Sequence, residues 1–232
     1  MKFPAVTHVI FDMDGLLLNT EDLYFIAFQN ICTPYGKVYS YELKSQIMGK
    51  KIEYCAETII KALDLPITVK DFKRKLDHQI DLLFSHSKVL PGVKKLVNHL
   101  VSHNIPIGMC TGSTEKAYTI KTLKHEDLFS HFNPKVFCGS DKEVKNGKPH
   151  ADAYEITRRR FRPNIPQSDK CLVFEDSPNG VLSAISAKMQ CVMVPDPRLK
   201  AEYLKKATCV ITSLDDFVPE DFGLPPYPKV AN

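Results

Sequence analysis

The sequence of 232 residues contains no apolar run that approaches the roughly 20 residues needed to cross a bilayer. Its first residues, Met-Lys-Phe-Pro-Ala, lack the long apolar segment of a secretory signal peptide. We therefore expect no membrane partner and a cytoplasmic location.

The seven cysteines include no Cys-x-x-Cys pair, and their number is odd. Most lie within apolar runs, where a free cysteine behaves as a small buried hydrophobic residue. The sequence thus predicts neither a disulfide framework nor a zinc site. It instead predicts a protein of a reducing compartment. His99 and His103 have the i, i+4 spacing of zinc ligands, but we expect them opposite the apolar face of their helix, without a nearby third ligand.

Strong charge of one sign is also missing, because 31 basic and 27 acidic residues give a formal net charge of only +4. The basic cluster at 158–162 has no interleaved aromatic residues on which bases could stack. We therefore expect no nucleic-acid partner. Hydrophobic residues make up 44% of the chain, which is ordinary for a globular protein with one large domain, or one domain and a small second one.

The chain does contain an unusual acidic motif near its start. The apolar run 9–11 predicts a strand buried on both faces, and Asp12, Asp14 and Gly15 follow it directly. Open α/β sheets bind their ligands at the carboxyl ends of such strands. Two carboxylates this close repel each other unless a cation or a shared proton lies between them. A helix cap or turn is the alternative, since Asp is common where strands end.

The remaining pattern predicts an α/β fold with a helical insertion. Apolar spacing predicts helices at 21–31, 41–48, 53–63 and 71–84. Beyond residue 90, helices alternate with predicted strands at 105–110, 135–138, 171–174, 190–194 and 208–211. This alternation is typical of a parallel sheet that is covered on both faces. We expect a core of residues 1–18 and 89–232, with 19–88 as a separate helical domain.

Polar residues follow several of these strands and could meet at one edge of the sheet. They are Asp12, Asp14, Thr111, Lys148, Glu175 and Asp176. Each has an ordinary alternative role by itself, as a helix cap or as a surface lysine. Together they provide carboxylates for a divalent cation, and a hydroxyl and an ammonium for an oxyanion.

Phosphoryl transfer is the chemistry that requires such a set. Asp12 can act as a carboxylate nucleophile. Magnesium prefers hard oxygen ligands and bridges to phosphate, which suits Asp12 and Asp176, with Glu175 close by. Lys148 would stabilise charge on the transferring oxygens.

Two further roles complete the predicted site. The Thr111 hydroxyl and the Gly112 amide could hold another phosphate oxygen. Asp14 would protonate the leaving alkoxide and then deprotonate the attacking water. That role requires a pKa raised toward neutrality by burial or by the neighbouring carboxylates.

The four motifs Asp12-Met13-Asp14-Gly15, Thr111, Lys148-Pro149 and Glu175-Asp176 occur in the order that is typical of the haloacid-dehalogenase (HAD) superfamily, which the chain resembles over nearly its whole length. The resemblance implies a Rossmann-like core, a small α-helical cap and Mg²⁺. It also implies Asp12 as nucleophile, Asp14 as acid and base, and the Asp14 backbone carbonyl as a metal ligand. The second Asp of the first motif resembles the phosphatase branch, whose substrate is a small phosphate monoester. A monomer is the usual state for this cap type.

Longer stretches are similar to the animal phosphatases of pseudouridine 5′-phosphate within that family. They are FDMDGLLLNTE, MGKK at 48–51, CLVFEDSPNGV at 171–181, MQCVMVPD at 189–196 and FGLPPYP near the end. The cap segment at Gly49, Lys50 and Lys51 is a candidate substrate-binding turn, with an exposed basic turn as the alternative. Two positions depart from the pattern of these relatives. Asn19 stands where they usually carry Asp, and Ala151 stands where they commonly have a second Pro before the Asp. We expect that Asp, Asp152, to cap its helix.

Two other functions are compatible with the same motifs. A sugar-phosphate phosphatase or a β-phosphoglucomutase-like phosphotransferase would share all of them, and the side chains of the cap would decide between the reactions. A binding protein that kept the fold without turnover would have lost a nucleophile or an acid, but both Asp12 and Asp14 are present.

Overall fold

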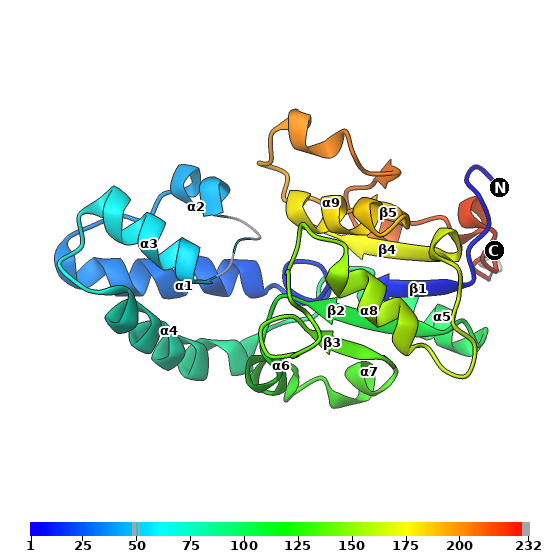
Figure 1. Ribbon diagram of the computed structural model, residues 1–232, viewed down its shortest axis with the longest axis horizontal. Coiled ribbons are helices and arrows are strands. Elements are labelled where there is room, and N and C mark those ends of the chain that lie inside the picture. Colours follow the sequence, from blue (N-terminus) through cyan, green and yellow to red (C-terminus); the bar gives the residue numbers. More distant parts are fainter. Residues whose placement is uncertain (48–49, 51, 229–232) are drawn as a thin grey trace.

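The computed structural model describes residues 1–47, 50 and 52–228 of the chain. Six parallel strands form one sheet in the order β3-β2-β1-β4-β5-β6 (Figure 1). Their bounds are β1 His8–Phe11, β2 Ile107–Thr111, β3 Lys135–Phe137, β4 Cys171–Glu175, β5 Gln190–Met193 and β6 Cys209–Val210. The predicted α/β class with a parallel sheet is confirmed.

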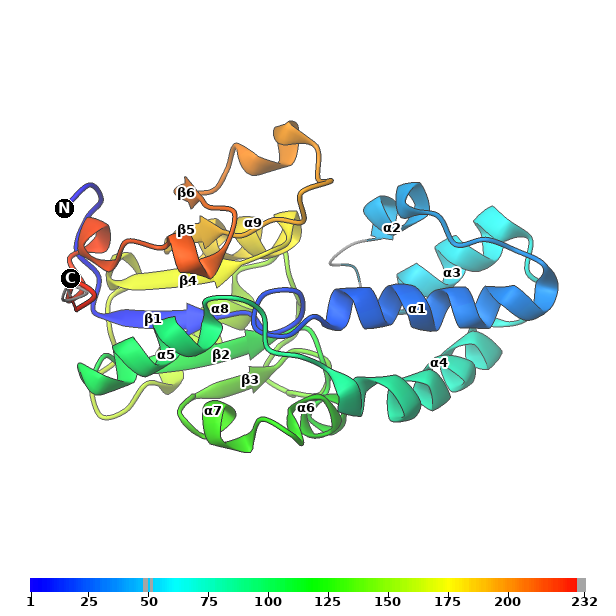
Figure 2. The ribbon, with the colours of Figure 1, turned by 180° about the vertical axis from the view of Figure 1, so that it is seen from behind.

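Helices cover both faces of this sheet. They are α5 Val93–Ser102, α6 Glu115–Thr122, α7 Glu126–Ser130, α8 Asp152–Arg160 and α9 Pro178–Ser186. Helices α8 and α9 lie on one face, and α5 lies on the other (Figures 1 and 2). Val9 and Phe11 join the apolar core on the α5 side, whereas Ile10 between them joins the core with α8 and α9. The apolar run of β1 is thus buried on both faces, as its composition predicts.

The segment from 20 to 86, which we call the helical insertion, forms an apolar cluster of its own. It contains α1 Thr20–Cys32, α2 Tyr41–Ile47, α3 Ile52–Leu63, α4 Val69–Leu83 and the 3-10 turn η2 Phe84–His86. Fully or nearly fully buried residues such as Phe28, Ile59 and Phe72 make up its centre. It lies beyond the carboxyl ends of the strands, away from both chain termini (Figures 1 and 2).

Two chain segments connect the helical insertion to the sheet, and they lie side by side. The Asn19 amide N–H donates to the Lys88 carbonyl over 3.0 Å, and the Lys88 N–H donates to Oδ1 of Asn19 over 2.7 Å. Leu90 N–H donates to the Leu17 carbonyl over 3.0 Å. The side-chain oxygen of Asn19 therefore makes the contact that an Asp could make here. The expected limits at 18/19 and 88/89 fall within this pair of connections.

Three details differ from the sequence-based expectations. Helix α9 begins at Pro178 rather than Val181, because the Ser177 hydroxyl accepts from the Gly180 N–H and proline suits the first turn. His99, which we expect opposite the apolar face of its helix, is nevertheless buried, and its Nε2 lies 2.8 Å from the Pro225 carbonyl oxygen. The short helix α7 lies in a region for which the sequence predicts no element.

Candidate active site

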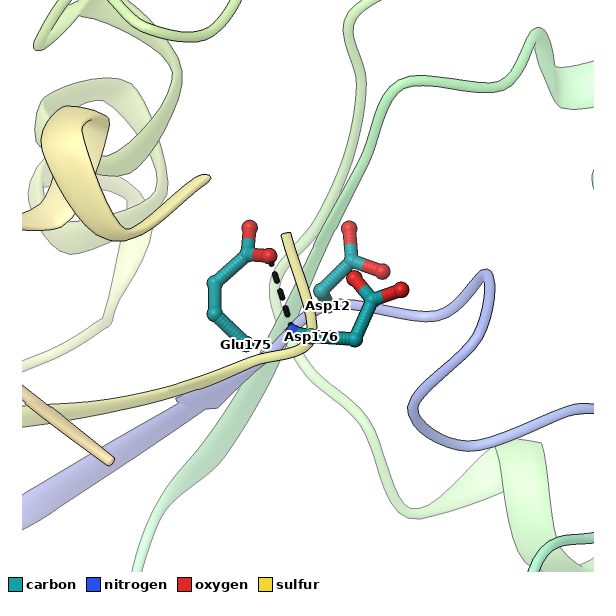
Figure 3. A group of neighbouring side chains, drawn as sticks. All are labelled: Asp12, Glu175 and Asp176. Carbon is teal, nitrogen blue, oxygen red and sulfur yellow. Dashed lines mark hydrogen bonds between the residues drawn. The ribbon is translucent and has the colours of Figure 1, made fainter. Parts of the chain in front are cut away.

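Three carboxylates meet at the carboxyl ends of the central strands. Asp12 follows β1 directly, Glu175 ends the adjacent β4, and Asp176 comes next in the chain (Figure 3). One oxygen from each can be chosen so that all three lie within 4.8 Å of one another. All three residues are buried, with Glu175 completely so.

The positive charge near the acidic cluster does not balance its negative charge. Burial raises the pKa of Asp12 well above its ordinary value, and the charges of Glu175 and Asp14 add to this against the opposing Lys148. Burial likewise raises the pKa of Asp176, together with the charges of Asp12 and Glu175. Hard carboxylate oxygens gathered with unbalanced negative charge are a donor set that fits Mg²⁺.

Lys148 reaches this cluster from the loop before α8. Its Nζ lies 2.5 Å from Oδ1 of Asp12, 2.6 Å from Oε1 of Glu175 and 3.2 Å from the Cys110 carbonyl oxygen. The Tyr154 ring lies beneath it, with its centroid 5.0 Å from Nζ. The neighbouring carboxylates outweigh the cost of burial, and they hold the pKa of Lys148 well above its ordinary value. A phosphoryl group beside Asp12 would therefore meet a permanently charged donor.

Glu175 is held by donors on both of its oxygens. Oε1 accepts from Lys148 and, over 2.5 Å, from the Tyr154 hydroxyl. Oε2 accepts from the N–H groups of Asp176 and Ser177 and from the Ser177 hydroxyl. Gly180 leaves room for this arrangement, because a Cβ there would lie 1.8 Å from the Glu175 carboxyl carbon. Glu175 is thus placed to orient Lys148 and the turn that carries Asp176.

Asp14 points to a different set of partners. Its Oδ1 accepts from the Thr20 hydroxyl over 2.6 Å and from the Lys121 ammonium, and its Oδ2 accepts from the hydroxyls of Thr111 and Ser113, each over 2.8 Å. Burial acts to raise the pKa of Asp14, but Lys121 and the hydroxyls of Thr20 and Ser113 together lower it below its ordinary value. The expectation of a raised pKa is therefore wrong for this arrangement, in which Asp14 is an ionised carboxylate.

Lys121 and Ser113 are site residues that the sequence reasoning missed. The Lys121 side chain is 0% exposed, and its Nζ lies 2.7 Å from Oγ of Ser113. Burial opposes its charge, but Asp14 outweighs that cost and raises the pKa of Lys121. In the sequence it is one of many lysines in amphipathic helices, and no local pattern distinguishes it.

The neighbouring residues Thr111 and Gly112 differ in their relation to the cavity. Thr111 is completely buried, donates to Asp14 and accepts from the Ser113 N–H over 3.0 Å. Its hydroxyl thus orients Asp14 in this arrangement. Gly112 lines the cavity, and a Cβ there would meet no atom within 4 Å.

A cavity of about 590 Å³ lies between the carboxyl ends of the strands and the helical insertion. Asp12, Asp14, Lys148 and Asp176 line one side, and aromatic and charged side chains of the insertion line the other. Lys50 is on that second side, with its Nζ 5.9 Å from the centroid of the Tyr54 ring. The other two candidates of the basic turn, Gly49 and Lys51, lie outside the described residues.

Three further sequence-based predictions concern the cysteines, membrane-spanning helices and Asp152. All seven cysteines lie in the described part of the chain and are free thiols. No described helix is long and apolar enough to cross a membrane. The expectation that Asp152 caps α8 is wrong, because Ala151 precedes the helix without a side-chain cap and Asp152 accepts from the Asn146 N–H over 3.0 Å.

The chain is similar to known proteins over most of its length. The model of the haloacid dehalogenase-like hydrolase family matches residues 9–194. A Drosophila melanogaster protein named probable pseudouridine-5′-phosphatase is 46% identical over 222 residues, which cover 96% of each chain. (DL)-glycerol-3-phosphatase 2 of Arabidopsis thaliana is 42% identical over 96% of this chain and 93% of its own.

A solved structure has the same fold. A HAD family hydrolase from Deinococcus radiodurans, with bound phosphate and sodium, covers 95% of this chain and 98% of its own with a TM-score of 0.77 and 19% identity. The family match and the two phosphatases assign the reaction class as well as the fold. The chain belongs to the haloacid dehalogenase-like hydrolase family and is a phosphatase of that family.

Proposed function

We propose that this phosphatase hydrolyses pseudouridine 5′-phosphate, and that it does so through a phosphoryl group carried transiently on Asp12. The observation that supports this most is the position of the Asp12 carboxylate, which lines the cavity beside Lys148 and Asp176. We propose this substrate because the chain is 46% identical, over nearly its whole length, to the Drosophila protein named probable pseudouridine-5′-phosphatase.

Asp12 begins the reaction. One of its carboxylate oxygens forms a bond to phosphorus, and the bond from phosphorus to the ester oxygen breaks. Lys148, held by Glu175, stabilises the charge on the transferring oxygens. Water then attacks the same phosphorus, the bond to Asp12 breaks, and inorganic phosphate leaves.

Asp14 transfers the protons in this scheme. It begins the cycle as the protonated acid, gives its proton to the departing alkoxide and takes one from the attacking water, so that it is protonated again at the end. Because Lys121 and the hydroxyl donors favour its ionised form in the present arrangement, Asp14 must take up a proton when the phosphate ester binds. The hydroxyls of Thr111 and Ser113 hold its carboxylate in place. The substrate must compete with these donors for Asp14, because both of its oxygens are engaged.

Asp12 and Asp176, with the Asp14 backbone carbonyl, are the residues we propose to hold Mg²⁺. When bound, Mg²⁺ would offset the charge repulsion between the carboxylate nucleophile and the anionic phosphate. The hydrogen bonds already made by Glu175 favour a supporting role for it, although its carboxylate belongs to the same cluster.

Around the substrate, we propose that the helical insertion, within expected limits of 19–88, acts as a cap. Its side chains line the cavity opposite Asp12, where they exclude water and contact the alcohol part of the ester. Lys50 is the described member of the proposed basic turn. We also propose a cytoplasmic monomer, in keeping with seven free cysteines in a reducing compartment.

A glycerol phosphate is the second candidate substrate. The Arabidopsis glycerol-3-phosphatase is nearly as similar to this chain, at 42% identity over 96% of it. A small polyol would occupy little of a cavity of about 590 Å³, so we rank it below the nucleotide.

A phosphate-release screen tests the proposal. Pseudouridine 5′-phosphate, uridine 5′-phosphate, glycerol 3-phosphate and glucose 1-phosphate are compared with Mg²⁺ present. We expect the highest kcat/KM for pseudouridine 5′-phosphate and none above background for Asp12→Asn. A preference for glycerol 3-phosphate would select the second candidate. Conversion of the hexose phosphate to an isomer without phosphate release would replace hydrolysis by phosphotransfer.

A further inference from the structure

Lys121 is a buried cation of the site that the proposed mechanism does not use. It lies on α6 and its side chain has no exposed surface. Its Nζ donates to Oδ1 of Asp14 and to Oγ of Ser113, and Ser113 in turn donates to the other oxygen of Asp14. Lys121 thus contacts the Asp14 carboxylate both directly and through one hydroxyl.

The other neighbours of Lys121 belong to the helical insertion. The Tyr24 hydroxyl of α1 lies 3.3 Å from Nζ, and the centroids of the Tyr24 and Phe84 rings lie 4.8 and 5.0 Å from it. These two rings contact each other edge to face, with centroids 4.7 Å apart. A cation over aromatic faces is stabilised by the ring quadrupoles, the more so when it is desolvated.

Tyr24 and Phe84 lie near the two ends of the helical insertion. Tyr24 is in the first turns of α1, just after one connection, and Phe84 begins η2, just before the other. Ser87, in the returning connection, donates its hydroxyl to the backbone carbonyl of Lys121 over 2.5 Å. Both ends of the helical insertion and its returning connection therefore contact the residue that holds Asp14.

We propose that Lys121 is a positioning residue that orients the Asp14 carboxylate for proton transfer to the leaving oxygen and couples that orientation to the two ends of the helical insertion. This rests on the proposed function of Asp14. Its hydrogen-bond partners among the described residues of the cavity lining are Asp14, Ser113 and Tyr24. None of these belongs to the cluster of Asp12, Glu175 and Asp176, so Lys121 acts on the reaction through Asp14.

This role makes a prediction that a purely structural role does not make. A leaving group that departs as a stable phenolate needs no proton, whereas an alkoxide does. Moreover, kcat/KM reports only the steps up to departure of the leaving group when that departure is irreversible. Loss of Lys121 should therefore slow the alkyl ester and spare the aryl ester.

The experiment compares kcat/KM of Lys121→Met for pseudouridine 5′-phosphate and for p-nitrophenyl phosphate. Methionine is chosen because it is unbranched and fits an aromatic cage. We expect the alkyl ester to lose about tenfold to a hundredfold, in the range of a misplaced general acid, and the aryl ester to change by less than about threefold. Lys124→Met is the matched control, because Lys124 is exposed just beyond the same helix. It should leave both values unchanged.

A parallel loss on both esters, or an unchanged alkyl ester, would overturn the proposal. If Lys121→Met does not fold, the Tyr24→Phe variant provides the test instead. It keeps the charge of Lys121 and removes only the Tyr24 hydroxyl, which lies 3.3 Å from Nζ. We expect a smaller loss confined to the alkyl ester, and no selective loss in that variant would then overturn the proposal. If the wild type does not hydrolyse pseudouridine 5′-phosphate, the substrate assignment fails separately, and glycerol 3-phosphate serves as the alkyl ester.

Discussion

Lys148 Nζ lies 2.5 Å from Oδ1 of Asp12 and 2.6 Å from Oε1 of Glu175. One buried ammonium therefore bridges the proposed nucleophile and the carboxylate behind it. Glu175 is completely buried and is held by Tyr154 and by the turn at Ser177, so the ammonium has a rigid support. A group fixed in this way can stabilise developing charge without rearranging during the reaction.

Replacement of Lys148 by methionine should lower kcat by about a hundredfold to a thousandfold, as the loss of one preorganised donor does. Steady-state assays on the folded protein measure this. Stability should also fall, by about 3–5 kcal/mol, because the change leaves two buried carboxylates without their partner. Lys145→Met is the control, since Lys145 is exposed three residues earlier. Wild-type turnover in Lys148→Met would remove Lys148 from the mechanism.

Magnesium should stabilise the protein, and the effect should depend on pH. The pKa values of Asp12 and Asp176 are raised in the folded chain without metal. At pH values between the ordinary pKa and the raised one, the folded chain therefore binds protons that the unfolded chain has released. Their contribution to stability therefore falls as pH rises from about 4, the ordinary value, through the raised values. At neutral pH, Mg²⁺ at roughly 100 times its Kd should add about 2.7 kcal/mol.

For a chain of this size that free energy corresponds to roughly 5–10 °C in Tm, which differential scanning fluorimetry measures. The Mg²⁺-dependent shift should shrink as pH is lowered through the raised pKa values, because protonated carboxyls bind cations weakly. Asp176→Asn should raise the Tm of the metal-free protein and abolish the Mg²⁺ shift, whereas Asp22→Asn, at an exposed position, should do neither. An equal Mg²⁺ shift in Asp176→Asn would contradict the metal assignment.

Gly15→Ala should weaken Mg²⁺ binding. Gly15 has φ = +83°, and a Cβ there would lie 2.2 Å from Oδ2 of Asp176. Either the turn or the Asp176 carboxylate must therefore move. The Mg²⁺-dependent Tm shift should be reduced or lost in this variant. Gly112→Ala is the matched control for that readout, since its Cβ meets no atom within 4 Å, and a normal Mg²⁺ shift in both would exclude the close approach.

The Asn19 side chain should be replaceable by aspartate but not by alanine. Its Oδ1 accepts from the Lys88 N–H over 2.7 Å, and an Asp carboxylate offers the same acceptor. Asn19→Asp should keep the wild-type Tm to within about 2 °C. Asn19→Ala should lower it by roughly 2–4 °C, for the loss of about 1 kcal/mol of hydrogen bonding. Equal Tm values for the two variants would show that this contact does not stabilise the connections.

The sheet and its acidic edge could be predicted because they depend on short-range pattern. The apolar runs before Asp12 and Glu175 predict buried parallel strands, and the topology then brings their ends together. Short helices such as α7 and the start of α9 depend on capping contacts that the apolar period does not include.

The state of Asp14 could not be predicted in the same way. The sequence indicates burial and neighbouring carboxylates around Asp14, and both raise a carboxyl pKa. The charged partner is Lys121, 107 residues away, which the packing of α6 against η2 and the returning connection brings to Asp14. The pKa of a buried carboxyl depends on tertiary contacts, and Lys121 together with the hydroxyls of Thr20 and Ser113 reverses the direction of the shift in Asp14.

The most direct test of the account is to trap the acyl phosphate on Asp12. The enzyme is mixed with pseudouridine 5′-phosphate and Mg²⁺, quenched within one turnover and treated with borohydride, which reduces an acyl phosphate to an alcohol. Peptide mass spectrometry should then find homoserine at position 12, only when substrate was present and not in Asp12→Asn. Turnover at the full rate with unmodified Asp12, or reduction at another carboxylate, would contradict the assignment of Asp12 as the nucleophile.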